Sequence, residues 1–329
     1  MRPRVLFSVL GLLAAAAFAA SLAVGPADVG PGQSLSALLR DDGGPLTIVM
    51  REIRLPRAIL GALVGASLGL SGAAMQGYLR NPLAEPGLIG ISGSAALGAV
   101  IAIHTGLAAA FALALPLAAL GGSALAVLLI LLLAGPRGSS MTLILAGIAI
   151  SALAGALTAL VLNLSPNPFA AYEIMFWLMG SLADRSFSHV WLALPFILAG
   201  GLALLMTARG LDALTLGEDA AQSLGIRLDR LRLLLVGGTA AAVGASTAVA
   251  GAIGFVGLVV PHLLRPFVGA RPALLLPASA LGGATLLLLA DVAVRVVLPT
   301  RDLQLGVLTA LVGAPLFLHL IFKTRREFA

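Results

Sequence analysis

The sequence predicts an all-α protein that crosses a membrane about ten times, with both termini in the cytoplasm. Hydrophobic residues make up 60% of the 329 positions and charged residues only 10%, and the mean hydropathy is +1.07, far from the values of a soluble globular domain. Apolar runs bounded by glycine, proline and charge recur along the whole chain. Runs of about 20 residues match the bilayer as helices, and a helix satisfies its own backbone polar groups there.

Ten apolar runs are the predicted spans, and together they make residues 1–329 one transmembrane domain. The first run follows Arg2 and Arg4 and contains many small residues, so it also resembles a secretory signal; its length favours a retained helix. The third and eighth runs are the shortest. In chain order the spans are 5–25, 56–78, 87–104, 107–134, 141–163, 190–208, 231–252, 253–268, 272–296 and 303–322.

Glycines mark the packing face of the second span. Gly61, Gly65 and Gly69 recur every four residues and therefore lie along one stripe of the helix. Small residues let two helix backbones approach closely in a membrane. We expect this stripe to pack against another helix of the same chain.

Basic residues indicate the orientation. Under this topology thirteen of the 20 Lys and Arg residues lie on the side of the termini and seven lie opposite. Cytoplasmic loops carry the excess of positive charge, so both termini should be cytoplasmic. The outer group includes Arg51, Arg54 and Arg57, directly before the second span. They are either interfacial anchors that snorkel to lipid head groups or a patch that receives an acidic partner.

The longest polar stretch on the predicted cytoplasmic side, residues 209–232, reads as a short helix with defined ends. Thr215 and Glu218 have the spacing of a capping box, Asp219 favours a helix N-terminus, and Gly225 provides a C-terminal stop. This segment, about 210–230, is either a plain connector or a coupling helix that fits a cleft on a partner ATPase.

Several chemistries are excluded or disfavoured. The chain has no cysteine, and its one lysine, Lys323, lies near the C-terminus, so no G-x-x-x-x-G-K-[ST] loop can form and any ATP hydrolysis belongs to a separate subunit. The histidines are scattered, and neither H-E-x-x-H nor G-x-S-x-G occurs. A membrane enzyme is therefore disfavoured.

A carboxylate inside an apolar span is a functional suspect, and Asp291 is the one that we place there. Arg295 follows it by four residues on the same helical face, so an i,i+4 ion pair is the expected role and proton coupling the minority alternative. An ion-coupled secondary transporter built around a midplane site needs more such groups than this.

The chain resembles the permease family of type II ABC importers, which move ferric siderophores, haem or cobalamin. Six ordered segments carry the resemblance across almost the whole sequence. They are RLPRAILGALVGASLGLSGAAMQGYLRNPLAEPGLIGIS (54–92), LILAGIAISAL (143–153), FWLMGSL (176–182), LGEDAAQSLGI (216–226), GAIGFVGLVVPHLLR (251–265) and LGVLTALVGAPLFLHL (305–320).

The resemblance implies a multi-pass inner-membrane permease that binds no cofactor and no nucleic acid. Its expected partners are a second copy of itself, two cytoplasmic ABC ATPases that bind ATP and Mg, a periplasmic substrate-binding protein and the surrounding lipid. The expected cargo is an iron chelate, either a ferric siderophore or haem, with cobalamin as the alternative.

Individual positions also follow from the resemblance. Arg54, Arg57 and Arg295 match the arginines that dock the binding protein, whereas Arg51 and Arg301 match none and stay with the anchor interpretation. The coupling positions are Thr215, Leu216, Gly217, Glu218, Asp219, Ala220, Ala221, Gln222, Ser223, Leu224 and Gly225.

The expected cytoplasmic gate consists of Asn81 and Leu83 after the second span and Ser140 and Met141 before the fifth. Met141 stands where the family has a smaller polar residue, which changes the expected gate chemistry. Pro261, His262 and Arg265 match a further family segment at the cytoplasmic face. His262 has no ligand partner nearby in sequence, and we expect a structural role for it.

Overall fold

The computed structural model describes residues 3–25, 30–39, 43–111, 113–135, 140–165, 168–297 and 303–327, and every regular element within these ranges is a helix. The long helices are α1 (Pro3–Ala23), α4 (Leu55–Leu79), α7 (Ala114–Ala134), α8 (Ser140–Asn163), α10 (Phe187–Met206), α13 (Leu228–Ala250), α15 (Pro272–Val297) and α16 (Leu305–Glu327).

Shorter helices connect or extend them. The α-helical ones are α2 (Pro31–Leu39), α3 (Pro45–Ile48), α5 (Ile91–His104), α6 (Leu107–Ala110), α9 (Pro168–Leu178), α11 (Ala208–Leu214), α12 (Glu218–Ser223) and α14 (Val256–Leu264). A π-helical turn, η1 (Val49–Arg54), leads into α4, and two 3₁₀ turns are η2 (Pro86–Ile89) and η3 (Arg265–Val268).

The helix lengths agree with the predicted spans. Within the described residues, seven helices are long and apolar enough to cross a membrane, and three shorter apolar helices (91–104, 256–268 and 305–318) accompany them. Each of these ten segments overlaps one predicted span. The all-α, polytopic fold is thereby confirmed, and the number of crossings stays a prediction.

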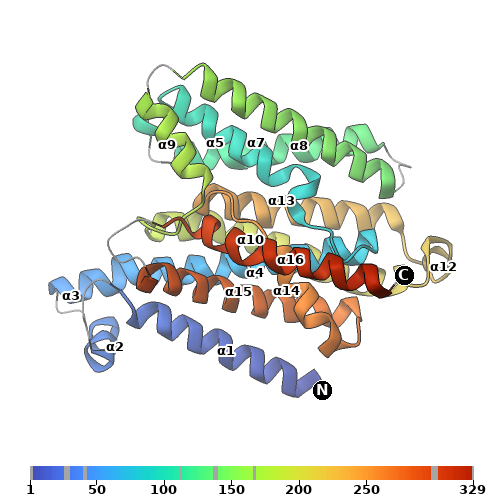
Figure 1. The fold of residues 1–329 in the computed structure, drawn as a ribbon, viewed down its shortest axis with the longest axis horizontal. Helices are drawn as coiled ribbons and strands as arrows, with labels where there is room; N and C mark the ends of the chain where they lie inside the picture. The colour runs from blue at the N-terminus through green and yellow to red at the C-terminus, as the bar shows by residue number, and fades with distance from the viewer. Residues whose placement is uncertain are drawn as a thin grey trace.

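The long helices lie roughly parallel to one another in three groups (Figure 1). The helices α5, α7, α8 and α9 form one side of the bundle, and α1, α14 and α15 form the other, with α4, α10 and α13 between them. The central α4 and α13 are the most buried of the long helices, with 78% of their most apolar window inside the protein. Side chains of the core therefore come mainly from these two helices and their neighbours.

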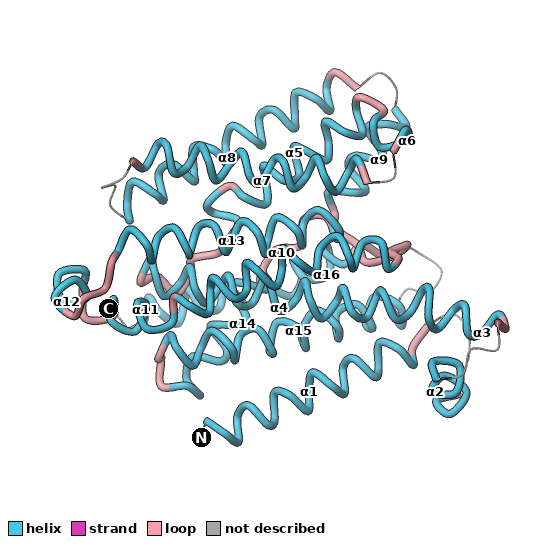
Figure 2. The backbone as a smooth tube through the Cα atoms, turned by 180° about the vertical axis from the view of Figure 1, so that it is seen from behind, coloured by secondary structure: helices cyan, strands magenta, loops and turns pink. Residues whose placement is uncertain are grey.

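The two ends of the bundle differ. The start of α1, the last turns of α16 and the short helix α12 lie at one end, whereas α2 and α3 lie at the opposite end (Figures 1 and 2). We call these the α12 end and the α2 end. The two termini thus share a side with the predicted coupling segment.

Glycines bring the central helices together. A Cβ added at Gly65 would overlap the backbone of Gly283 in α15, and one at Gly69 would overlap the carbonyl of Ser279 in the same helix. Each contact is therefore backbone against backbone. The prediction that the stripe packs against another helix of the same chain is confirmed.

Two predicted spans are interrupted. The third does not begin at residue 87, because residues 81–90 turn back into the bundle, where the Ser151 hydroxyl of α8 donates to the Gly87 carbonyl at 3.2 Å. Pro82 and Pro86 lack the N–H groups that a continuous helix needs. The eighth begins only at Val256, after a nonhelical stretch from Gly251.

The helix α9 was not predicted. It lies between the fifth and sixth predicted spans, and its 11 residues are too few to cross the bilayer at 1.5 Å per residue. An apolar run of this length gives no signal of a membrane span.

Candidate functional site

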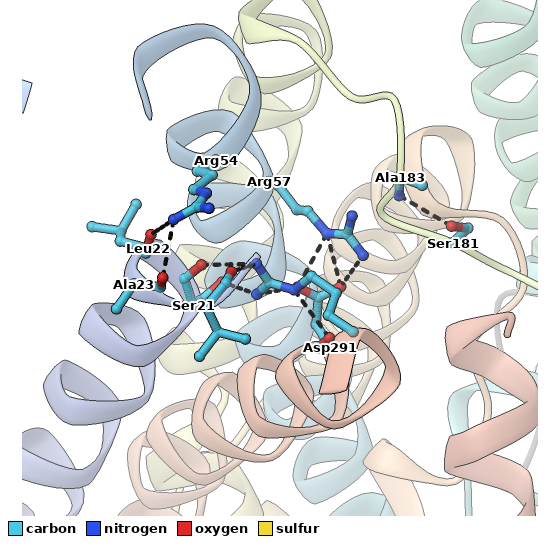
Figure 3. Close-up of polar contacts among 10 residues, drawn as sticks. Ser21, Leu22, Ala23, Arg54, Arg57, Ser181, Ala183 and Asp291 are labelled. Carbon is cyan, nitrogen blue, oxygen red and sulfur yellow. Dashed lines mark hydrogen bonds and ion pairs between the residues drawn. The ribbon is translucent and has the colours of Figure 1, made fainter. Parts of the chain in front are cut away.

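A cluster of charged side chains joins three helices at the α2 end (Figure 3). The Asp291 carboxylate of α15 accepts hydrogen bonds from Arg57 of α4, with Nη2 to Oδ1 at 2.8 Å and Nε to Oδ1 at 3.0 Å. Arg295 lies one turn along α15 and places Nη2 2.9 Å from Asp291 Oδ2. One carboxylate therefore holds two guanidinium groups.

The same cluster holds the end of α1. Arg54 Nη1 donates to the carbonyl oxygens of Leu22 and Ala23, both at 3.0 Å. Arg295 Nη1 donates to the Ser21 carbonyl, and its Nη2 donates to the Ser21 hydroxyl, both at 2.9 Å. The last carbonyls of a helix have no partner within that helix and carry partial negative charge, so arginine is the expected donor.

The predicted docking arginines are thus mostly covered. Arg54 is 4% exposed, and the Arg57 and Arg295 side chains are 19% and 8% exposed. Their docking role stays a prediction. The predicted pair of Asp291 with Arg295 is confirmed.

The pairing of Asp291 with Arg57 was missed because 234 residues separate the two in sequence. No local signal connects them. For the remaining outer arginines, Arg51 donates from Nη2 to the Leu38 carbonyl of α2 at 3.0 Å, so it joins α2 to η1, and its role as an interfacial anchor stays a prediction. Arg301 lies outside the described residues.

The predicted coupling segment is two short helices, α11 and α12, at the α12 end (Figure 2). Thr215 does not form the predicted capping box, because it ends α11 and its hydroxyl donates to the Asp212 carbonyl at 2.7 Å. The residue that precedes α12 is Gly217, whose φ of 105° suits glycine. Thr215 and Glu218 have the spacing of a capping box, but α12 begins two residues later than that motif requires.

The predicted stop at Gly225 is confirmed. Its φ is +82°, its N–H donates to the Gln222 carbonyl at 2.8 Å, and the Ile226 N–H donates to the Ala221 carbonyl at 3.0 Å. These two bonds are those of a Schellman motif. The C-terminus of α12 is therefore fixed by its own backbone.

Apolar side chains flank α12 at the surface. Leu216 is 68% exposed and Leu224 is 64% exposed, whereas Ala221 between them is buried. The helix is thus buried at Ala221, and the residues directly outside it carry exposed leucines. Exposed leucines beside charged residues are typical of a contact surface for a partner.

The predicted gate residues lie on different segments. The Leu83 N–H donates to the Asn81 Oδ1 atom at 2.9 Å, which makes a tight turn directly after α4. Ser140 begins α8, and its side chain is outside the described set. Met141 follows with 63% exposure.

Three hydrogen bonds hold α14 and the irregular stretch before it in place. Arg265 Nη2 donates to Gln76 Oε1 at 2.7 Å, and Gln76 Nε2 donates to the Leu258 carbonyl at 3.2 Å, so the α14 segment is tied to α4. The Phe255 N–H donates to Glu85 Oε1 at 2.8 Å. Glu85 lies within residues 81–90 directly before the 3₁₀ turn η2, and its role could not be found from periodicity because this segment has no continuous α-helix.

An apolar cavity of about 610 Å³ lies where the end of α9, the stretch before α14 and the first half of α16 meet. Its lining includes Met179, Gly254, Phe255, Ala310 and Leu311. Within the described residues, no group of three His, Cys, Asp or Glu side chains is placed to hold a metal ion. The lining of the cavity is therefore apolar and provides few polar groups that could bind a specific ligand.

The model of the FecCD transport family matches residues 12–323. This chain belongs to the FecCD transport family. The vitamin B12 import system permease protein BtuC of Salmonella paratyphi A is 40% identical over 317 residues, which cover 96% of this chain and 94% of that protein. The hemin transport system permease protein HmuU of Yersinia pestis is 39% identical over 282 residues, 84% of each chain.

A solved structure agrees with these relatives. It is an inward-facing conformation of a metal-chelate type ABC transporter, 34% identical, with a TM-score of 0.84 over 98% of this chain and 99% of that one. As a FecCD permease, this chain is a multi-pass protein of the bacterial inner membrane and a permease subunit of an ABC importer, which works with ATPase and binding-protein partners. The secondary transporter and the membrane enzyme are thereby set aside.

Proposed function

We propose that two copies of this FecCD permease enclose the membrane pathway of an ATP-driven importer that carries a metal chelate into the cytoplasm. The observation that carries the proposal is the match to chelate permeases over almost the whole chain, in sequence and in fold. The proposed cargo is an iron chelate, either a ferric siderophore or haem, with cobalamin as an equally supported alternative, because the named relatives include a hemin permease and a vitamin B12 permease.

The cavity beside α16 supports the pathway. Its walls are apolar and include glycine and alanine, which leave room for a bulky cargo and hold it weakly. Leu311 and Val312 of α16 are 65% and 51% exposed, and a second copy of the chain across this face would enclose the passage. Selectivity would then come mainly from the binding protein.

The α12 end supports contact with the motor. We propose that it faces the cytoplasm and that residues 215–225 sit in a cleft of an ABC ATPase, with Leu216 and Leu224 as the apolar contacts. ATP and Mg would bind only to that partner. Asn81, Leu83, Ser140 and Met141, all near this end, would close the pathway toward the cytoplasm.

The α2 end supports contact with the binding protein. The cluster of Arg54, Arg57 and Arg295 against one carboxylate, Asp291, leaves positive charge in excess, which suits an acidic partner. Arg57 is the most exposed of the three. We propose that it meets the partner while the other two hold the surface in shape.

Reconstitution tests this function. The permease is placed in liposomes with its ATPase and binding protein, and uptake of haem, a ferric siderophore and cobalamin is measured with and without ATP. ATP-dependent uptake of one chelate is expected, and uptake in the absence of the ATPase subunit contradicts the proposal.

Leu224→Asp should abolish capture of the ATPase, because a charge would enter an apolar contact. Leu39→Asp, on α2 at the other end with 74% exposure, is the matched control and should leave capture unchanged.

A further inference from the structure

The coupling segment is fastened to the beginning of α15. Asp212 in α11 accepts a hydrogen bond at Oδ1 from the Ala273 N–H at 2.9 Å. Pro272, the first residue of α15, has no N–H, and the Leu274 and Leu275 N–H groups donate to the Arg271 carbonyl. Of these N–H groups in the first turn, that of Ala273 has no acceptor within the helix. Asp212 of the neighbouring segment supplies the acceptor.

Apolar packing reinforces the same junction. Leu211, directly before Asp212, is fully buried. A Cβ built on Gly77 of α4 would lie 3.5 Å from Leu211 Cδ1 and 3.7 Å from Pro272 Cβ. The coupling segment therefore rests where the last turn of α4 meets the first turn of α15.

These two helices pack as one body. Their backbones touch at Gly65, Gly69 and Gly283, and Arg57 and Asp291 join them again at the α2 end. Backbones in direct contact leave little room for sliding, since packed interiors move between discrete arrangements and do not deform continuously. Displacement of the first turn of α15 is thus carried to its far end, about 39 Å away for 26 residues.

We infer that Asp212 is a positioning residue through which the coupling segment moves the α4–α15 pair, so that the motor acts on the Arg57–Asp291–Arg295 cluster at the other end. This inference rests on the proposed function and adds to it the helix pair that receives the push. The carboxylate also lies 3.9 Å from Arg271 Nη2, but the Arg271 side chain is 69% exposed, and such surface pairs contribute little. The backbone hydrogen bond is the contact that matters.

The test uses the reconstituted complex with its ATPase and binding protein. Asp212→Ala removes the acceptor, whereas Asp212→Asn keeps an oxygen that can accept the same bond. Arg271→Ala removes only the exposed ion pair. Chelate transported per ATP hydrolysed should fall about tenfold in Asp212→Ala and should stay close to wild type in the other two.

A conformational readout separates coupling from plain stability. The chain has no cysteine, so Val297→Cys at the far end of α15, 67% exposed, takes a single fluorophore. ATP binding should change its emission in the parent and in Asp212→Asn, and this change should be absent in Asp212→Ala although the ATPase remains bound. Ala273→Pro removes the donor and leaves Asp212 intact; it should behave as Asp212→Ala does and replaces it if that variant does not accumulate.

Specific results would overturn the inference. An emission change and a transport ratio in Asp212→Ala equal to those of the parent would show that the push takes another route. A loss in Arg271→Ala as large as in Asp212→Ala would assign the effect to the ion pair. Failure of the proposed function is distinct, because the unmodified complex itself would then show no ATP-dependent uptake.

Discussion

The buried carboxylate of Asp291 forms ion pairs with Arg57 and Arg295. Arg295 also donates to the last turn of α1. The Asp291 side chain is 2% exposed, and its two ion-pair partners are 19% and 8% exposed. The free energy cost of burying a charged group is far smaller when the group is paired than when it is alone. Removal of Asp291 would therefore destabilise the protein mainly by leaving Arg57 and Arg295 without a countercharge.

Replacing Asp291 by Asn tests this arrangement. The partly buried Arg57 and the buried Arg295 would lose their countercharge, and breaking such a network costs on the order of 3 kcal/mol. Denaturant titration of the purified permease in detergent should show that loss. Asp229→Asn, at an exposed position in the first turn of α13, should change stability by less than about 1 kcal/mol. Equal stability of the two variants would contradict the assigned role of Asp291.

At the scale of single residues, the sequence predicts what local spacing determines. Asp291 and Arg295 are four positions apart on one helix, so their pairing follows from helix geometry. Arg57 reaches the same carboxylate only because α4 and α15 pack together, which spacing does not reveal. Thr215 shows the opposite case, where a correct motif spacing failed because the chain leaves α11 there and starts α12 later.

Among the elements, α4 and α15 pack backbone against backbone because glycine replaces side chains on the contact. At Gly65, an added Cβ would lie 2.8 Å from the Gly283 carbonyl carbon and 2.9 Å from Ala284 Cα. These are backbone atoms, which cannot turn aside as a flexible side chain does. The two helices would have to separate along their length.

Gly65→Ala is therefore expected to destabilise the permease by about 1–3 kcal/mol, the range for overpacked interiors. The thermal unfolding temperature in detergent is the measurement. Gly237→Ala is the matched control, because no atom lies within 4 Å of a Cβ there and alanine favours helix over glycine. A lower unfolding temperature in Gly237→Ala than in Gly65→Ala would refute the packing argument.

The long elements could be predicted because about 20 apolar residues in a row leave few alternatives in a bilayer. The segments near the cavity could not. Residues 81–90 and the stretch before α14 are irregular, and their polar groups are satisfied by distant partners such as Ser151 and Glu85. Hydropathy registers these segments as apolar and gives no sign that the helix is broken.

For the molecule as a whole, the two ends carry different devices. The α12 end has the exposed leucines and the junction with α15, whereas the α2 end has the arginine cluster. The orientation that assigns the α12 end to the cytoplasm comes from the distribution of basic residues. That distribution is a property of the entire chain and could be read before any fold was known.

Labelling of single cysteines tests the orientation directly, since no natural cysteine interferes. Gln222→Cys in α12 and Ser36→Cys in α2 are placed at opposite ends, and both native residues are exposed. A membrane-impermeant maleimide added to intact spheroplasts should label Ser36→Cys at once and Gln222→Cys only after permeabilisation. The reverse pattern would invert the topology and would place the proposed motor contact outside the cell.

The end of α1 has a consequence for how the chain matures. The hydrogen-bond donors of its last carbonyls are Arg54, which is synthesised about thirty residues later, and Arg295, which is synthesised some 270 residues later. A nascent chain that stops short of α15 therefore has the Arg54 contacts at the end of α1 but lacks those of Arg295. The end of α1 is therefore held in two stages during synthesis, first by η1 and only later by α15.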